Sequence, residues 1–198
     1  MSENIYIHVF QKGINSKMTI FKKLGIYAIT ASLGILTAGC GNSDNNSSAG
    51  VAAPTSTPKM ITHEELNITL PADYIQQDNE KYTFYYSNAN SICLGNKEPI
   101  DDLEASGITA GTIDDYVNII KEKSEIDTPT ETVEGNEEAR VFTWNNTFND
   151  NEYTYLGYVC KTTDAYWLIQ FACLAKDYNE LKPQFMNYLS TVEITSIP

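Results

Sequence analysis

The chain has 198 residues, with 26 acidic and 13 basic side chains and a formal net charge of −13 at pH 7. All but one of the acidic residues follow Gly39, whereas four lysines precede it, so the remainder of the chain is strongly acidic. Because such a surface repels the phosphates of a nucleic acid, we expect no nucleic-acid partner.

The beginning of the chain has the pattern of a secretion signal. Lys22 and Lys23 precede the apolar run of residues 24–36, "LGIYAITASLGIL". This run is too short for a membrane-spanning helix, which needs about 20 residues, and it fits the apolar core of a signal peptide. We therefore predict a signal peptide over residues 1–39, with Met18 as an alternative start of the chain.

Small residues end this segment directly before a single cysteine, in the stretch "LTAGC". The stretch resembles the lipobox of bacterial lipoproteins, in which the cysteine receives a diacylglyceryl thioether. The resemblance implies cleavage between Gly39 and Cys40 and a lipid anchor on Cys40 at the extracytoplasmic face of the cell membrane. Thr37 stands where the lipobox usually has leucine. The alternative is an uncleaved apolar anchor followed by an incidental cysteine.

Residues 40–60 are rich in Asn, Ser, Gly, Thr and Pro. A segment of this composition buries too little apolar surface to offset its ordering entropy. We interpret it as a lipid-anchored flexible linker. Residues 61–198 then form the folded domain.

The domain begins with strand patterns. Leu66, Ile68 and Leu70 alternate with polar residues, which predicts a half-buried strand ending near Pro71. Residues 82–87 and 91–95 predict a hairpin, because "NAN" between them suits a turn. Three further strands, over residues 138–145, 152–161 and 165–174, predict an antiparallel meander. The last is apolar at nearly every position, so we expect it in the middle of the sheet.

Two helices are expected. Residues 113–120 place apolar side chains on one stripe, and Thr112 suits the N-cap position. A second helix is predicted over residues 178–192, restarting at Pro183 because proline lacks the N–H that a helix interior needs. The final "VEITSI" predicts a short closing strand.

This order predicts an α+β domain, with a mainly antiparallel sheet of about six strands and helices packed on it. The stretches "ITLPADY", "TIDDYVNII" and "AYWLIQFACLAKDYNELKPQFMNYLSTV" resemble the PsbP/Mog-like fold. That family includes extrinsic photosystem subunits, a Ran-binding nuclear protein and bacterial lipoproteins. The resemblance implies a binding or assembly module and supplies no shared set of catalytic residues.

The residues themselves offer little for catalysis or metal binding. After processing, the remaining histidine is His63, next to the linker, and the cysteines of the domain are scattered, so we expect no catalytic triad, zinc site or cofactor. Acidic residues are concentrated in residues 98–115 and 149–152, which lack the spacing of an EF-hand, and we interpret both stretches as solvated loops. A small enzyme that uses acidic residues and a calcium-responsive module remain alternatives.

The domain has three cysteines, Cys93, Cys160 and Cys173, all in predicted strands. Cysteine in apolar surroundings commonly behaves as a small hydrophobic residue, so buried thiols are favoured over a disulfide. A disulfide between two of the three is the alternative. Folding about residues 162–164 places Tyr166, rather than Cys173, near Cys160.

Thirteen tyrosines stand out in the composition. We select Tyr82, Tyr85, Tyr153 and Tyr155 as candidate binding residues, because amphipathic rings suit the recognition of sugars, peptides or protein surfaces. Ordinary packing within the sheet is the alternative, since tyrosine favours strands. Together these observations predict a membrane-anchored, non-catalytic module that binds a protein, a peptide or an envelope component.

Overall fold

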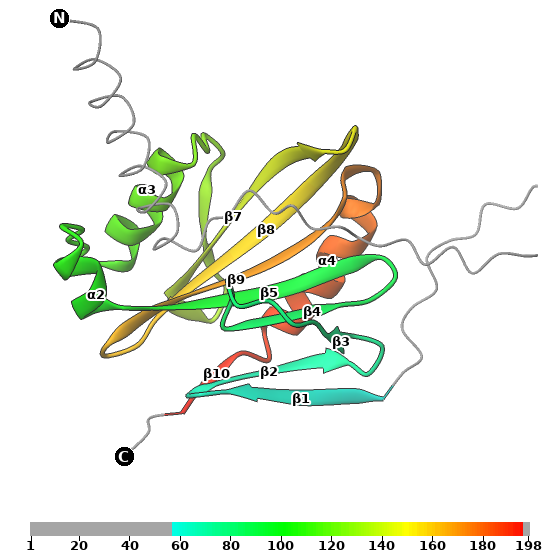
Figure 1. Ribbon diagram of the computed structural model, residues 1–198, viewed down its shortest axis with the longest axis horizontal. Coiled ribbons are helices and arrows are strands. Elements are labelled where there is room, and N and C mark those ends of the chain that lie inside the picture. The colour runs from blue at the N-terminus through cyan, green and yellow to red at the C-terminus, as the bar shows by residue number, and fades with distance from the viewer. Residues whose placement is uncertain (1–56, 196–198) are drawn as a thin grey trace, which may run out of the picture.

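The computed structural model describes residues 57–195, which form two antiparallel sheets with helices on both sides of the larger one (Figure 1). The predicted signal peptide, Gly39 and Cys40 lie outside these residues. Within residues 57–195, no helix has both the length and the apolar character needed to cross a membrane.

The larger sheet has seven strands in the order β3-β4-β5-β9-β8-β7-β6. Its strands are β3 (Ile75–Gln76), β4 (Phe84–Ser87), β5 (Ser91–Pro99), β6 (Thr130–Val133), β7 (Asn136–Phe148), β8 (Asn151–Lys161) and β9 (Ala165–Leu174). All of its strand pairs are antiparallel. The apolar strand β9 lies in the middle, as its sequence predicts, and all but its last residue are buried.

The smaller sheet has three strands, β1 (Pro58–His63), β2 (Leu66–Pro71) and β10 (Glu193–Ile194), in the order β1-β2-β10. The alternating residues of β2 are buried, and the closing strand β10 is present as expected. The α+β class is therefore confirmed, but the strands divide into two sheets. The sequence did not reveal β1, β3 or β6, because these short edge strands lack an apolar alternation. Strand β1 begins within the stretch that we assigned to the linker.

The helices are α2 (Ile100–Ala105), α3 (Ile113–Lys123) and α4 (Tyr178–Leu189), the last preceded by the 3-10 turn η1 (Ala175–Asp177). Helix α3 has the predicted cap: Thr112 and Asp115 form a reciprocal capping box. Helix α4 runs through Pro183 instead of restarting there. Because Pro183 and Asn179 are both exposed, the Asn179 carbonyl that the proline leaves without an N–H donor lies on the solvent side.

The two hairpin turns of the meander differ from the prediction. Strand β7 continues to Phe148, so the predicted polar loop shrinks to Asn149 and Asp150, both with positive φ as a tight primed turn requires. The next turn closes between Thr162 and Ala165. The register therefore places Trp167 opposite Cys160, one residue away from the predicted neighbour Tyr166.

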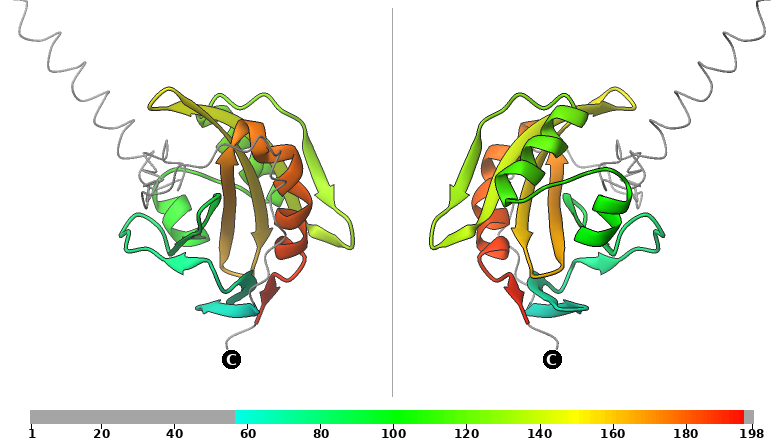
Figure 2. Two further views of the ribbon diagram at one scale, coloured as in Figure 1. Left: turned by 90° about the vertical axis from the view of Figure 1, so that its right-hand side faces the viewer. Right: turned by 90° about the vertical axis from the view of Figure 1, so that its left-hand side faces the viewer.

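The larger sheet is covered differently on its two faces. The smaller sheet and α4 pack on one face and form the main hydrophobic core with it. Helices α2 and α3 pack on the other face around Phe142, Val159 and Leu168. Figure 2 shows α4 and α2 on opposite sides of strands β8 and β9.

Candidate functional site

The candidate functional site lies on the face of the larger sheet that α2 and α3 cover only in part. Residues paired across antiparallel strands point to the same face, so Leu94, Gln170 and Gly157 define this face across β5, β9 and β8. Helices α2 and α3 occupy the end of the face around Leu168. The other end carries a separate cluster of aromatic side chains.

We refer to this group as the aromatic cluster. Its buried members are Ile92, Leu94, Tyr153, Tyr155 and Ala172, and its partly buried members are Tyr82, Tyr85, Trp144, Phe148 and Leu174. None of these residues belongs to a helix of the described domain. The structure thus brings together all four tyrosines that were selected from the sequence, and it adds a tryptophan and a phenylalanine.

The rings of the cluster contact one another in two groups. The Trp144 and Tyr155 rings are stacked, with centroids 5.0 Å apart and planes 11° apart. The Tyr82 and Tyr85 rings meet edge to face at 5.9 Å. Tyr155 is only 2% exposed, whereas Tyr82, Tyr85 and Trp144 remain partly accessible. The accessible rings are therefore held in place by buried neighbours.

A glycine in β8 makes room for the tryptophan. A Cβ atom added to Gly157 would lie 2.9 Å from the Trp144 ring and 3.2 Å from the Phe142 ring. Real Cβ atoms essentially never come within 3.0 Å of another atom, so the absence of a side chain at Gly157 leaves the room that the Trp144 ring needs. Sequence reasoning missed Trp144, although it stands two residues after Phe142 and hence on the same face.

Burial keeps the phenol groups of Tyr155 and Tyr85 neutral at physiological pH. Burial raises the pKa of Tyr155 to about 12, with the neighbouring Tyr153 and Tyr85 hydroxyls adding to the shift. Burial also raises the pKa of Tyr85. The partly exposed Tyr85 therefore offers an uncharged ring and hydroxyl group to a partner.

Gln170 lies between the aromatic cluster and the part of the same sheet face that α3 covers. Its side chain is buried, at 1% exposure, and its Nε2 atom has no hydrogen-bond partner within the described residues. An unpartnered buried donor costs about 1–3 kcal/mol. A water molecule or ligand with an acceptor at this position would remove that cost.

Two acidic segments border the aromatic cluster. Asp78 and Glu80 lie in the connection that leads to Tyr82, and both are exposed. Asp150 and Glu152 lie at the β7–β8 turn and are also exposed. Because Glu152 alternates with Tyr153 along β8 and accepts a hydrogen bond from Asn145 on the opposite face, the carboxylates next to the rings are those of Asp78, Glu80 and Asp150.

A buried carboxyl group lies under α3, at the other end of the same face. Glu98 is 6% exposed, and its Oε2 atom accepts a hydrogen bond of 3.0 Å from the hydroxyl of Tyr116. Its Oε1 atom has no partner among the described residues. Burial raises the pKa of Glu98 to about 8, against the lowering effects of the Tyr116 bond and of Lys123. Sequence reasoning missed the burial of Glu98, because this residue stands in a stretch that we expected to be solvated.

The acidic stretch of residues 98–115 contains helices, contrary to the solvated loop that we predicted. It contains α2 and the start of α3, and Asp115 serves in the capping box of α3. Asp114 forms an ion pair with Arg140, with an Oδ1–Nε distance of 2.7 Å. No group of three or more His, Cys, Asp or Glu side chains within residues 57–195 is arranged to hold a metal ion.

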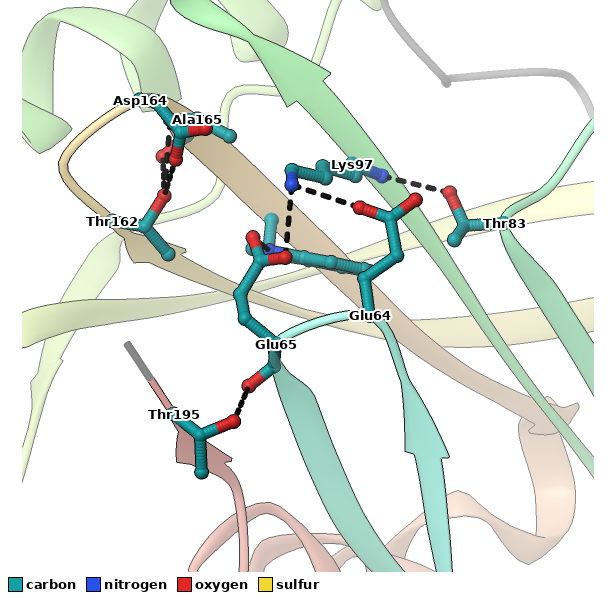
Figure 3. A network of polar contacts seen from close by, with 9 residues as sticks. Glu64, Glu65, Thr83, Lys97, Thr162, Asp164, Ala165 and Thr195 are labelled. Carbon is teal, nitrogen blue, oxygen red and sulfur yellow. Dashed lines mark hydrogen bonds and ion pairs between the residues drawn. The ribbon is translucent and has the colours of Figure 1, made fainter. Parts of the chain in front are cut away.

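A second polar network joins the two sheets (Figure 3). Lys97 of β5 donates hydrogen bonds of 2.8 Å to Glu64 and to Glu65, in the β1–β2 turn. The indole of Trp167 donates to the other carboxylate oxygen of Glu65 at 2.9 Å. Thr195 donates to the backbone carbonyl of Glu65. Because every one of these contacts is made within the domain, we interpret the network as a structural connection.

The remaining sequence candidates also have structural roles. Cys93, Cys160 and Cys173 are buried free thiols, as favoured from the sequence, and burial raises the pKa of each. His63 stacks on Phe84 with centroids 5.0 Å apart. Burial lowers the pKa of His63.

Neither a protein-family model nor a curated protein sequence matches the chain. Solved structures do resemble it. The Ran-binding protein Mog1p of Saccharomyces cerevisiae has 8% identity and a TM-score of 0.49, over 71% of this chain and 96% of its own. A protein from Bacteroides thetaiotaomicron has 11% identity and a TM-score of 0.50, over 71% of this chain and 49% of its own. The cyanobacterial PsbP protein of Synechocystis has 13% identity and a TM-score of 0.41, over 76% and 98%. At such identities the likeness concerns the fold.

Proposed function

We propose that the protein is a non-catalytic binding module, anchored to a membrane by lipid on Cys40, and that it contacts its partner through the aromatic cluster. The observation that carries the proposal is the gathering of the partly exposed rings of Tyr82, Tyr85 and Trp144 next to the part of the sheet that α2 and α3 cover, with Trp144 in contact with both the aromatic cluster and the core under these helices.

The composition of the cluster suits an interface. Tyrosine and tryptophan combine a large apolar ring with a polar atom, and they lose little conformational entropy when they are buried against a partner. Here the accessible rings have ordered neighbours: the buried Tyr155 stacks on Trp144, and Tyr82 and Tyr85 contact each other edge to face while packing on the buried members of the cluster. A surface that is already ordered pays less entropy on binding than a flexible one.

Membrane attachment rests on the sequence. The apolar run before "LTAGC" and the polar linker after it are the features that support lipid on Cys40. A protein with two acyl chains is held stably at a bilayer without a spanning helix. Replacing Cys40 with serine should abolish incorporation of a fatty-acid probe in labelled cells. Continued labelling of the variant would refute the anchor.

Site-specific crosslinking tests the binding surface. A photoreactive amino acid is placed at Tyr82 in the full-length protein, and a matched control carries it at Thr132, an exposed residue of the edge strand β6. We expect a discrete crosslinked product in native membranes from position 82 and none from position 132. The proposal is wrong if position 82 gives no product or if both positions give the same one.

A further inference from the structure

We propose that the partner presents lysine or arginine side chains on an extended peptide segment, and that the aromatic cluster with its bordering carboxylates binds them. This inference rests on the proposed function above. It identifies the chemistry of the partner from the ring faces and the charges around them.

The partly exposed aromatic rings favour a partner with cationic side chains. The face of an aromatic ring carries a negative quadrupole and attracts a cation within about 6 Å of the ring centroid, most strongly at tryptophan. The cluster offers Trp144, Tyr82 and Tyr85 as partly exposed rings. The same domain already uses this contact internally, because Lys161 Nζ lies 5.4 Å from the centroid of Tyr166.

Exposed carboxylates near the rings also favour a cationic partner. Asp78 and Glu80 lie two to four residues before Tyr82, and Asp150 lies in the β7–β8 turn, two residues after Phe148 of the cluster. All three are exposed, so a partner's cationic group placed over the rings meets negative charge from both segments. Residues 78–82 and 150–152 contain one basic residue, Lys81, so both segments keep an excess of negative charge.

The cluster also suits an extended peptide better than a compact cation. Its rings come from the segment before β4 and from strands β4, β7 and β8, so they span the width of several strands. Tyr85 of β4 and Trp144 of β7 are four strand spacings apart, roughly 19 Å, and an extended peptide of ten residues spans about 30 Å. Basic side chains about six residues apart on one peptide can therefore reach both rings.

Peptide binding to the detergent-solubilised full-length protein tests the inference. The probe is a ten-residue peptide of alternating lysine and alanine, and the comparison peptides replace lysine with glutamate or with serine. Tryptophan fluorescence is a suitable signal, because Trp144 is partly exposed whereas Trp167 is fully buried. We expect the lysine peptide to bind, the glutamate peptide not to bind, and the affinity to fall with added salt.

Variants then locate the site, since any acidic protein attracts a basic peptide weakly. Replacing Tyr85 with leucine keeps an apolar side chain and should weaken the lysine peptide about two- to fivefold. The double variant D78N/E80Q, next to Tyr82, should weaken it by a similar factor. The matched control E134Q/E137Q removes the same charge from exposed positions near the β6–β7 turn and should leave the affinity unchanged.

The outcomes separate this inference from the proposed function. Equal weakening by the two charge variants, no effect of Tyr85→Leu, or tighter binding of the serine peptide or of a neutral oligosaccharide would overturn the preference for a basic segment. A crosslink from position 82 to a partner without such a segment would keep the proposed function and overturn this inference alone. Absence of the crosslink would overturn both.

Discussion

Replacing Glu98 with glutamine should stabilise the protein at neutral pH and flatten the pH dependence of its stability. In the folded state burial raises the pKa of Glu98 from its ordinary 4.5 to about 8, so the carboxyl group is protonated at pH 7. In the unfolded state the same group is ionised at pH 7. Folding must therefore take up a proton, which glutamine does not require.

The raised pKa of Glu98 determines how the free energy of unfolding changes with pH. Below pH 4.5 the group is protonated in both states and its favourable contribution is fully present. Between pH 4.5 and 8 the unfolded state loses its proton first, and the folded protein loses stability by 1.36 kcal/mol for each pH unit. At pH 7 this loss amounts to about 3 kcal/mol.

Urea unfolding followed by tryptophan fluorescence at pH 4.5 and pH 7 measures the effect. The free energy of unfolding of E98Q minus that of the wild type should grow by about 3 kcal/mol between these two pH values. His63 also titrates in this range, and its contribution cancels in the difference because both proteins contain it. Glu104→Gln on the exposed side of α2 is the control and should show no such growth. An identical pH dependence for E98Q and the wild type would refute the reasoning.

Three further predictions concern the stability of the fold. Lys97→Met leaves the carboxylate of Glu65 buried without its cation and should cost about 3–5 kcal/mol in urea unfolding. Gly95→Ala places a Cβ atom 2.3 Å from the Phe84 ring, and the same measurement should show a loss of about 1–3 kcal/mol, whereas an unchanged midpoint would mean that the ring moves freely. The three buried thiols should resist a thiol reagent in the native protein and react completely in denaturant without a reductant, and fast native labelling would contradict their burial.

Patterns within a single element were predictable from the sequence. The stripe of α3 and the continuous apolar run of β9 each point to one environment, and the structure places both as expected. Helix α2 was missed because it has only six residues and buries only Leu103, which is too little for a periodic signal. Strand β7 was cut short because its last residues, before Asn149, resemble a polar loop.

The site depended on pairings that one sequence does not display. Tyr153 and Tyr155 are two residues apart and must share a face of their strand. That Tyr85 lies on the same face follows only from the registers that join β4 to β5, β9 and β8. The burial of Glu98 likewise follows from its pairing with Tyr166 and from the docking of Tyr116 above it.

The smaller sheet places both ends of the described chain on one side of the larger sheet. Both of its outer strands pair with β2, so the described chain enters at Pro58 and leaves after Ile194 within one small sheet. This sheet packs on the face of the larger sheet opposite to the aromatic cluster. A bead or reporter protein joined directly at residue 57 or residue 195 would therefore lie on the side of the larger sheet opposite to the tyrosines of the aromatic cluster.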